Sequence, residues 1–404
     1  MSRRSFILSN AHLAIIKALY FNKAISALEI SKLTGASIPT ITKHLDELIS
    51  AGYIIEKGFA QSNSGRRPMQ YGLTTEHQYI LSVAMDQFYT RMVLVDMNGE
   101  FITEIYETEI NLNDDPAALE KLISSVKDFI SSTAIESDEI FVAGISMPGF
   151  IDVQNGNNRS FLHVEDLNLR EYLTDQLSVP VFIDNDSSVI ALAELKFGAG
   201  AVKTEVMVIN LSWGIGLGMI INNKIYRGFK GFAGEFSHIP IFDNDKICSC
   251  GKRGCLETQA SLITIEDNAV NEINNGTFTS LRLDNGRISI EQVISEAFQG
   301  DSLSIRLLSY AGYQIGRAIA ILIHILNPEV IVLSGRASRA GKFWLAPVQQ
   351  AINDYSIPTI TEGTDLVLSQ MGFNAQLIGS AALAVEQMSK ELFHQQQTSI
   401  NNNQ

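Results

Sequence analysis

The sequence predicts an α/β protein with a small helical domain at its start. Residues 10–49 hold three short apolar patterns with a helical period, and from about residue 78 apolar runs of strand length alternate with helical stretches. The chain has 404 residues, which is too many for a single hydrophobic core of ordinary size. Its 46% hydrophobic and 18% charged residues are typical of a folded protein. We therefore expect two or three domains.

The first domain, expected over residues 1–75, begins with helical patterns. Apolar residues recur at helical spacing through 10–21, and a second pattern over 25–33 stops at Gly35, a residue type that commonly ends helices. A third pattern follows Ser37, whose hydroxyl is a good N-cap. Two short helices joined by a tight glycine-containing turn predict a helix-turn-helix, in which the second helix enters the major groove of DNA.

Two short strands and a polar loop follow the third helical pattern. Residues 54–55 and 69–71 have the character of strands, and the loop between them holds Arg66 and Arg67. We expect this loop to be a wing whose arginines reach backbone phosphates or the minor groove. The polar side of the third helix predicts further DNA contacts from Ser37, Thr40, Lys43 and His44, although His44 alone is equally typical of a solvated helix face. The alternative interpretation is a three-helix protein-interaction module.

The charges are distributed unevenly along the chain. Residues 1–75 hold nine Lys and Arg against four Asp and Glu, the remaining residues hold 21 against 40, and the whole chain carries a formal charge of −14. We call residues 1–75 the head and the rest of the chain the body. A basic head followed by an acidic body favours a nucleic-acid contact confined to the head. No apolar run reaches the about 18 residues of a membrane span, and polar residues interrupt the apolar start. We expect a cytoplasmic protein without a membrane partner.

The body shows the alternation of an α/β fold with mixed sheets. Strands are expected at 79–85, 91–96, 140–146, 181–183, 206–211, 217–221 and 330–333, and helices at 115–132, 187–197, 301–326 and 376–393. No short internal repeat is present, although two similar α/β lobes would not produce one. The polar end, residues 394–404, is expected to be a flexible tail.

All three cysteines lie between residues 248 and 255. An odd number of cysteines in so short a stretch indicates metal ligation in a reducing compartment and not a disulfide framework. Together with one histidine they supply three thiolates and one imidazole, a complete tetrahedral set that leaves no open position for a catalytic water. We therefore expect a structural Zn²⁺ ion, and the alternative is an accidental cluster of reduced cysteines. The expected ligands are His238, Cys248, Cys250 and Cys255.

Several segments together resemble the ROK family, a bacterial group of sugar kinases and sugar-responsive repressors. The resemblance covers nearly the whole chain, and the helix-turn-helix makes it similar to the repressor branch of the NagC/XylR type. It implies an actin-like, ribonuclease H-like fold with lobes at 76–188, completed by the helix 376–393, and at 189–375, with sugar in the cleft. The segments are ISMPGFID (145–152), IDND (183–186), WGIGLG (213–218), AGEFSH (233–238), CSCGKRGCLE (248–257) and NPEVIVLSG (327–335).

The resemblance also implies a set of sugar-binding residues. Carboxylates and amides match an array of sugar hydroxyls in a partly desolvated cleft. Glu235 and Glu257 flank the cysteine loop, and His238 is expected to turn one ring nitrogen to zinc and the other toward the sugar. For any single acid, a solvated surface carboxylate is the alternative. The full implied set is Asn185, Asp186, Glu235, His238 and Glu257.

In kinases of this family an aspartate acts as general base and three glycine-rich turns hold the nucleotide. Asp186 stands at the position of that base. All three turns depart from the pattern: Phe88 replaces glycine in the first, Trp213 enters the second, and Ser334-Gly335-Arg336 replaces paired glycines in the third. We therefore expect sugar binding without phosphorylation, with Asp186 as a vestigial base. The alternatives are an active sugar kinase with a DNA-binding head and an interaction protein with a vestigial sugar site.

These observations together predict a sugar-responsive transcriptional regulator, a repressor of carbohydrate-use genes. A sugar or sugar phosphate is the expected effector, and it changes DNA affinity only if it prefers one of two conformations. Two recognition helices about 34 Å apart read the two half-sites of an operator. We therefore expect a homodimer, or a dimer of dimers, on an inverted repeat, with the inducer weakening binding. The helix at 301–326 is one candidate for the dimer contact.

Overall fold

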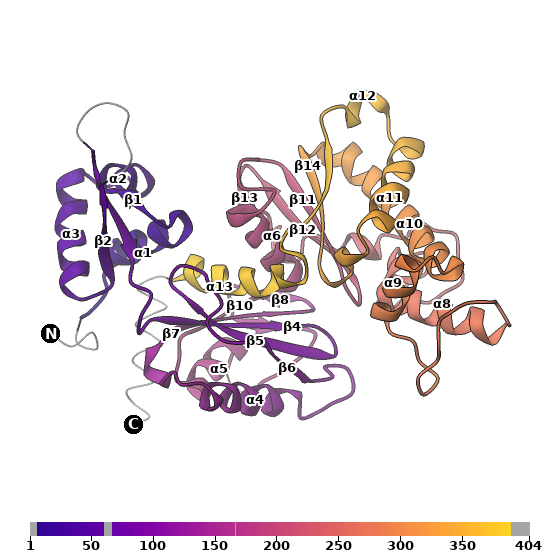
Figure 1. Cartoon of the computed structure of the whole chain (residues 1–404), viewed down its shortest axis with the longest axis horizontal. Coiled ribbons are helices and arrows are strands. Elements are labelled where there is room, and N and C mark those ends of the chain that lie inside the picture. Colours follow the sequence, from indigo (N-terminus) through magenta and orange to yellow (C-terminus); the bar gives the residue numbers. More distant parts are fainter. Residues whose placement is uncertain (1–5, 60–66, 166, 389–404) are drawn as a thin grey trace. The chain divides into compact units, whose positions relative to one another are not determined.

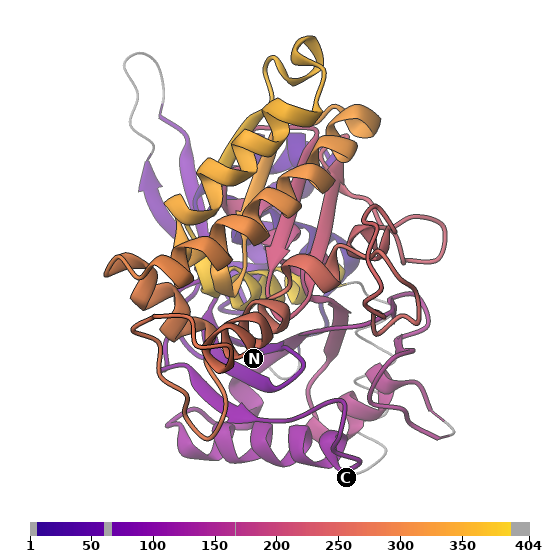
Figure 2. The ribbon, with the colours of Figure 1, turned by 90° about the vertical axis from the view of Figure 1, so that its right-hand side faces the viewer.

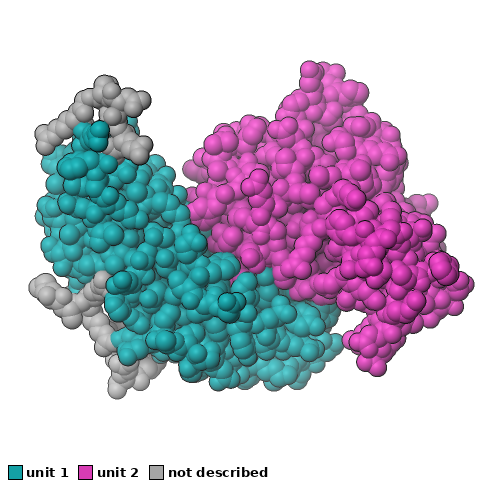
Figure 3. Space-filling model, viewed as in Figure 1, with its two compact units in different colours: residues 1–184, 380–404 teal, residues 185–379 magenta. Residues whose placement is uncertain are grey.

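The computed structural model describes residues 6–59, 67–165 and 167–388. The chain divides into two compact units, residues 1–184 with 380–404 and residues 185–379 (Figure 3). Arg66 and the predicted tail 394–404 lie outside the described residues. The head groups with the first lobe in one unit, so its separation as a domain stays a prediction. The predicted lobe boundaries at 188 and 375 differ from those of the units by four residues each.

The head has three helices and a three-stranded sheet (Figure 1). The predicted helix over 25–33 starts two residues late, because Ile25–Ser26 forms a strand that pairs with Tyr71 and Gln70. Ser26 is the N-cap of the helix: its hydroxyl accepts from the Glu29 N–H while Glu29 bonds back to Ser26. The sheet has the order β1-β3-β2. The elements are α1 (Asn10–Asn22), β1 (Ile25–Ser26), α2 (Ala27–Thr34), α3 (Ile38–Ser50), β2 (Ile54–Phe59) and β3 (Met69–Leu73).

Helix α3 and the wing strands follow from local sequence. Ser37 caps α3 by accepting from the Thr40 N–H, and proline follows within the first turn, where its missing N–H costs nothing. The buried face of α3 consists of Ile41, Leu45 and Leu48. Strands β2 and β3 are longer than predicted, and they pair antiparallel with an irregularity between Glu56 and Gly58.

The remainder of the first unit is built on a five-stranded sheet of order β10-β7-β4-β5-β6. Strand β4 pairs antiparallel with β5 and parallel with β7. Helices α4 and α5 cover one face of this sheet, and α13 lies on the other (Figure 1). The elements are β4 (Tyr79–Met85), β5 (Tyr89–Asp96), β6 (Tyr106–Glu109), α4 (Ala118–Ser132), β7 (Ile140–Met147), β8 (Ile151–Asp152), β9 (Asn157–Asn158), α5 (Leu169–Leu177), β10 (Val181–Asn185) and α13 (Ala375–Gln387).

Helix α13 contacts this sheet at very short range, and a glycine makes the approach possible. A Cβ on Gly144 of β7 would lie 1.8 Å from the carbonyl oxygen of Ser380. The Ser380 hydroxyl donates to the Val83 carbonyl at 3.0 Å and bonds to the Ser146 hydroxyl at 2.8 Å. The residues of α13 from Ser380 onward therefore belong to the first unit, whereas the first five residues of the helix belong to the second.

The second unit repeats the strand arrangement of the first. Its sheet has the order β13-β12-β11-β14-β15, in which the first three strands in sequence form an antiparallel meander and the last two run parallel to the first. When the strands of each five-stranded sheet are numbered in chain order, both sheets have the spatial order 3-2-1-4-5. Two lobes with the same sheet agree with the predicted two-lobed body. The strands are β11 (Val206–Leu211), β12 (Ile215–Ile221), β13 (Lys224–Ile225), β14 (Val330–Ser334) and β15 (Asp365–Leu368).

Helices cover both faces of this second sheet. Helix α6 packs on one face, and Figure 2 shows α10 and α11 side by side in front of the strands on the other. None of the helices in the described part of the chain is long and apolar enough to cross a membrane. The helices are α6 (Asp186–Phe197), α7 (Glu257–Ala260), α8 (Leu262–Asn274), α9 (Ile290–Phe298), α10 (Ser302–Leu326), α11 (Lys342–Tyr355) and α12 (Pro358–Thr361).

Two glycines bring α10 and α11 together. A Cβ on Gly316 would lie 2.5 Å from the Val348 carbonyl, and one on Gly312 would lie 2.9 Å from Pro347. Trp344 of α11 is completely buried beside them, and its indole N–H donates to the Ala337 carbonyl at 2.7 Å. The pattern that predicts α10 does not predict α11, because Pro347 stands inside it and proline usually ends a helix.

Replacing Asp301 with alanine is expected to destabilise the second unit by about 1–2 kcal/mol, because Asp301 caps α10. Its carboxylate accepts from the N–H groups of Ser304 and Ser280, each at 2.8 Å, and from the Thr279 hydroxyl. Burial works against ionisation, but these donors outweigh it and lower the pKa of Asp301 to about 2. Because the pKa is lowered in the folded state, ionised Asp301 contributes fully to the free energy of unfolding above the unfolded-state pKa of about 4. This contribution disappears as the pH falls toward 2.

Urea unfolding of the full chain between pH 7 and pH 3 measures both effects. Asp301→Asn is the matched control, since asparagine caps helices about as well but does not ionise. The Asp301→Asn variant is expected to keep most of the stabilisation that the helix cap gives. The part of the stability that depends on ionisation of Asp301, and therefore on pH, is expected to be lost. Equal pH dependence in the wild type and Asp301→Asn would contradict this assignment.

Candidate functional site

Four potential metal ligands converge in the second unit. Nδ1 of His238 lies 3.4 Å from Sγ of Cys248, and Sγ of Cys250 lies 3.6 Å from Sγ of Cys255. All four ligand atoms lie within 4.8 Å of one another. Around a tetrahedral ion with usual bond lengths, two sulfurs are about 3.8 Å apart and a sulfur and a nitrogen about 3.5 Å apart. The predicted Cys3His set is therefore able to hold one metal ion.

Tight turns present these ligands. The Cys248 N–H donates to the Lys252 carbonyl and the Gly251 N–H to the Cys248 carbonyl, each at 2.8 Å. Gly254 has a φ of +80°, and a Cβ there would lie 2.4 Å from the Phe242 carbonyl. Only glycine fits this position, since both the backbone conformation and the close approach exclude a side chain. The loop carrying the cysteines is thus folded back on the segment that follows His238.

Glu257 lies where the cysteine loop meets the turn after β11. It begins α7, two residues after Cys255, and its Oε2 accepts from the Ile215 N–H at 3.3 Å. A Cβ on Gly214 would lie 3.2 Å from the same oxygen, so the carboxylate lies directly against the glycine turn. The cysteine loop therefore brings a carboxylate to the carboxyl end of β11.

Asn185 and Asp186 stand at the start of α6 and are linked to the same strand. Asn185 is the N-cap: its Oδ1 accepts from the Ser187 and Ser188 N–H groups at 3.0 and 3.3 Å. Asp186 accepts from the Ser187 N–H at 2.7 Å and from the amide of Asn210, in β11, at 3.3 Å. The side-chain oxygen of Asn185 therefore has a capping role that the sequence analysis did not assign to it.

His238 lies between the metal ligands and Glu235. Its Nδ1 faces Cys248, and its Nε2 lies 3.9 Å from a carboxylate oxygen of Glu235. Burial raises the pKa of Glu235, His238 opposes this rise, and the negative charge of Glu257 adds to it. The two ring nitrogens thus point to different groups, as expected for a histidine that connects a metal with a polar site. The influence of Glu257 also indicates that the two carboxylates are within electrostatic range of each other.

A stack of three side chains lies at the carboxyl ends of β11 and β14. The guanidinium of Arg336 lies 5.0 Å from the centre of the Trp213 ring and 4.5 Å from the centre of the Phe373 ring. Arg336 also donates to Glu291 at 3.0 Å, and its side chain is only 12% exposed. Stacking on two rings is attractive for a guanidinium, and more so where water is excluded. Trp213 and Arg336 are also the residues at which we expect the second and third turns to depart from the kinase pattern.

The glycines of the segment WGIGLG serve packing. A Cβ on Gly216 would lie 1.8 Å from the Ser187 hydroxyl, and one on Gly218 would lie 2.4 Å from the Cβ of Ala191. These glycines are two residues apart in β12 and therefore face the same side, toward α6. Close packing of α6 on β12 accounts for their presence whether or not a phosphate binds nearby.

The segment around Phe88, where we expect a departure from the kinase pattern, forms a plain hairpin. Between β4 and β5, Oδ1 of Asp86 accepts from the N–H groups of Phe88 and Tyr89 at 2.8 and 2.7 Å. The Phe88 carbonyl accepts from the Ile110 N–H. The aspartate that opens this turn is thus engaged by the turn's own backbone.

The predicted DNA contacts are presented differently along the head. Thr40 and Lys43 are exposed on α3, and Arg67 is exposed at the start of the segment leading to β3. The Ser37 hydroxyl bonds the Thr40 hydroxyl at 2.8 Å in addition to capping the helix. Arg66, the other predicted wing contact, lies outside the described residues.

His44 is turned into the head. Its Nδ1 lies 2.9 Å from Glu47 and 3.1 Å from Nε2 of His12, and its side chain is 18% exposed. The bonds from His12 and His44 hold the pKa of Glu47 below its usual range. His44 thus takes part in a contact between α1 and α3 that the sequence analysis did not foresee.

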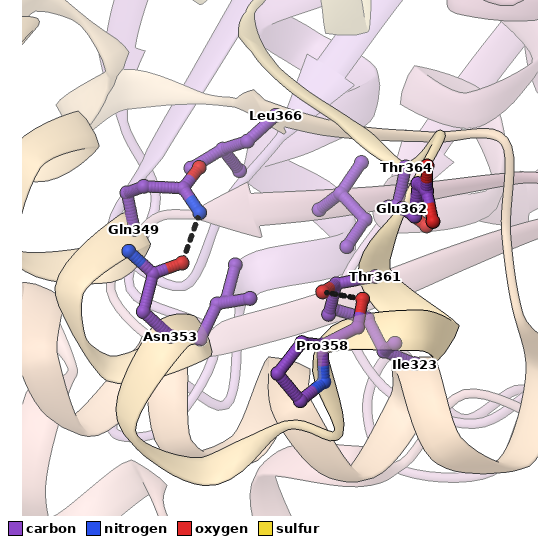
Figure 4. A pocket seen from close by; sticks show the side chains of 10 residues that line it. Ile323, Gln349, Asn353, Pro358, Thr361, Glu362, Thr364 and Leu366 are labelled. Carbon is purple, nitrogen blue, oxygen red and sulfur yellow. Dashed lines mark hydrogen bonds between the residues drawn. The ribbon is translucent and has the colours of Figure 1, made fainter.

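A cavity of 230 Å³ lies apart from these residues, between α10, α11, α12 and the strands β14 and β15 (Figure 4). Isoleucine and leucine side chains form its apolar part. Gln349 and Asn353, at its edge, bond to each other at 3.0 Å, and the Thr361 hydroxyl bonds to the Pro358 carbonyl. Glu362 and Thr364 also line the cavity, which lies apart from the residues predicted to bind sugar.

The ROK family profile matches residues 81–387. The chain belongs to the ROK family. A second profile, described as winged helix-turn-helix DNA-binding, matches residues 8–55. The resemblance noted from the sequence motifs is thereby confirmed, as are the predicted winged head and the predicted two-lobed body.

Individual relatives cover the chain to different extents. The xylose repressor of Caldicellulosiruptor bescii is 29% identical over 93% of this chain and 95% of its own length. A glucokinase of Halalkalibacterium halodurans is 31% identical over 74% of this chain and 92% of its own length. The crystal structure of a ROK family transcriptional regulator, a homologue of the E. coli MLC protein, has a TM-score of 0.75 at 26% identity and covers 97% of this chain and 100% of its own. The relatives that include the head are regulators, so this ROK protein resembles the repressor branch.

Asn210 and Phe373 are residues near the site that the sequence analysis missed. Asn210 is a buried polar residue in the otherwise apolar strand VMVINL, and that irregularity is visible in the sequence. Phe373 carries no such signal, because its place beside Arg336 arises from segments that are far apart in the chain.

Proposed function

We propose that this ROK protein is a sugar-responsive transcriptional repressor that acts in the cytoplasm on carbohydrate-use genes. It binds a DNA operator through its winged head and a sugar or sugar phosphate through the site in its second unit. The observation that carries the proposal is the combination in one chain of a DNA-binding head with a ROK body in which Glu235 lies beside a Cys3His cluster. The xylose repressor and the regulator structure, which share both parts, support it.

The sugar-binding residues proposed are Asp186, Glu235, His238 and Glu257, with Asn185 as a more distant candidate. Asp186 and Glu257 are both connected to the carboxyl end of β11, through Asn210 and Ile215. His238 connects Glu235 to the metal cluster. Such a group of acceptors suits several adjacent hydroxyls, because each carboxylate oxygen accepts from an O–H.

The metal proposed for the Cys3His cluster is a structural Zn²⁺. Thiolates and imidazole are ligands that zinc prefers, and four protein ligands leave no position for a reacting water. His238 would bind it through Nδ1, and Cys248, Cys250 and Cys255 through their sulfurs. The ion supplies no chemistry of its own, and its effect is to fix the loop between Glu235 and Glu257.

The DNA contacts proposed are Thr40 and Lys43 in the major groove and Arg67 and Arg66 at the wing. Ser37 places the first turn of α3, and His44 supports the helix from behind. The repressor acts as a homodimer, or a dimer of dimers, on an inverted repeat, because two recognition helices must reach two half-sites at once.

Helix α13 is the proposed connection between ligand and head. Its first five residues belong to the second unit, where Ala375 lies in the core beside α6, and the rest belongs to the first. Near its end, the Glu386 carbonyl accepts from the Lys17 ammonium of α1. A ligand that favours one conformation of the second unit thereby acts on the helix that supports the head.

A second part of the proposal is that the chain lacks sugar kinase activity. In support, Phe88 occupies the first turn, and Trp213 and Arg336 are stacked together at the second and third. A coupled assay with ATP and a panel of sugars is expected to show no turnover above background, and calorimetry is expected to detect no binding of a non-hydrolysable ATP analogue. Turnover at the rate of a working kinase, about 1–100 per second, would contradict it.

The main proposal is tested by measuring DNA binding and sugar binding on the same preparation. Operators are selected from random duplexes, and anisotropy then measures affinity while sugars and sugar phosphates are added. One compound is expected to raise the melting temperature and to lower operator affinity at least about tenfold, or about 1.4 kcal/mol. A preparation with intact metal that binds its operator equally well with every saccharide would overturn the proposal.

A further inference from the structure

Three side chains of the head converge between α1 and α3, at a point to which the proposed function assigns no ligand. His12 belongs to α1, and His44 and Glu47 belong to α3. Nε2 of His12 lies 2.8 Å from Oε2 of Glu47 and 3.1 Å from Nδ1 of His44, which lies 2.9 Å from the same oxygen. The three atoms form a nearly regular triangle, and the side chains are 7%, 18% and 35% exposed for His12, His44 and Glu47.

Protons alone do not satisfy this triangle. The Ser9 N–H donates to Nδ1 of His12 at 3.2 Å, which places the proton of the neutral His12 ring on Nε2. His12 and His44 then both donate to Glu47, and along the third side two N–H groups meet at an N···N distance of 3.1 Å. A cation at the centre of the triangle would attract all three atoms, because imidazole nitrogens and carboxylate oxygens are metal ligands.

The size of the triangle fits octahedral coordination. With bonds of about 2.1 Å, adjacent ligand atoms around an octahedral ion are about 3.0 Å apart. The observed sides run from 2.8 to 3.1 Å. Two imidazoles and one carboxylate on one face are a known donor set for first-row divalent metals, with the remaining positions open. We propose that His12, His44 and Glu47 form a second metal site, which takes a divalent transition metal ion completed by water.

Binding would change the tautomers of both rings. The ring proton of His12 moves from Nε2 to Nδ1, and that of His44 moves from Nδ1 to Nε2, so no net proton is released. The Ser9 N–H then loses its acceptor. Ser9 is half-buried, so water can replace this single long bond.

The bound ion would join the first helix of the head to its recognition helix. His44 and Glu47 lie on the same helix, α3, as the exposed residues Thr40 and Lys43. The Lys43 ammonium lies 3.8 Å from the second oxygen of Glu47. A metal that binds only the folded head stabilises it by mass action and holds α3 against α1. Metal availability would then set the operator affinity of the repressor independently of the sugar.

The experiment compares metal stoichiometry between variants of the full chain prepared without a histidine tag. After equilibration with Co²⁺, the wild type is expected to hold one more ion than His44→Gln or Glu47→Gln. Only the difference in bound ions between the wild type and a variant is used, so an ion in the Cys3His cluster cancels. The thiolate absorption of that cluster is expected to be equal in all variants. Asp46→Asn is the matched control, since it removes an exposed carboxylate beside Glu47 but no ligand.

Amide hydrogen exchange is a second measurement, and it distinguishes loss of the metal site from a variant that fails to fold. Co²⁺ is expected to slow exchange in α1 and α3 of the wild type and of Asp46→Asn, and to leave it unchanged in Glu47→Gln. Equal stoichiometry in the wild type and Glu47→Gln would overturn the proposal. So would exchange in the wild-type head that is the same with and without the metal.

Discussion

Replacing Cys248 with serine is expected to remove the metal from the Cys3His cluster and the sugar response with it. Cys248 is buried, and its sulfur lies 3.4 Å from Nδ1 of His238. A serine hydroxyl is a much weaker ligand than a thiolate, and the loop would lose the stabilisation that a bound ion gives to the folded state. Glu235 and Glu257, at the two ends of the loop, would no longer be held in one arrangement.

The measurement is a thermal shift and an operator titration on the same protein, together with its metal content. We expect Cys248→Ser to contain at least one ion fewer, to show no melting shift with the inducer, and to hold its operator at inducer concentrations that release the wild type. Operator affinity without sugar is expected to stay within about threefold, since α3 belongs to the other unit.

Lys252→Gln is the control for this variant. The Lys252 side chain is exposed, and the residue takes part in the cysteine turn through its backbone, so metal and sugar response are expected to remain. An inducer response of normal size in Cys248→Ser that has lost the ion of the Cys3His cluster would show that the cluster does not position the sugar-binding carboxylates.

Hydrophobic periodicity and capping residues predicted the elements in which the local sequence and the surrounding structure favour the same conformation. Helix α3 forms where Ser37 caps an apolar stripe, and α10 forms close to the predicted range 301–326. Prediction failed where tertiary contacts decide the conformation. Ile25 belongs by periodicity to a helix, but it pairs with Tyr71 in a strand, and Pro347 lies within a helix held against Gly312.

The candidate site divides in the same way. The Cys3His set was predictable because three cysteines and a histidine are close in sequence, and a short loop cannot place them far apart. Asp186 and Glu257 became recognisable only through family motifs, since single acids carry no signal of their own. The contact of His12 with His44 and Glu47 was not predictable, because it depends on how α1 crosses α3 and not on spacing within either helix.

Replacing Lys43 with glutamate is expected to weaken operator binding by about 1–3 kcal/mol, or about five- to 150-fold. Lys43 is 73% exposed on α3, and its ammonium is only loosely associated with Glu47 at 3.8 Å. An exposed pair of this kind contributes little to stability, so the head should remain folded. The reversed charge instead meets the negative field of the DNA, and the dependence of affinity on salt should become shallower by about one unit for each phosphate that the protein no longer neutralises.

Anisotropy titrations of the selected operator at several salt concentrations separate this effect from a general change in charge. Lys127→Glu, on the exposed side of α4, changes the net charge equally but lies outside the head, and its operator affinity is expected to stay close to that of the wild type. If the two variants bound the operator equally well at every salt concentration, α3 would not be the element that reads the DNA. A decrease in affinity confined to Lys43→Glu, with the sugar-induced melting shift unchanged, places recognition on α3 and leaves ligand binding to the second unit.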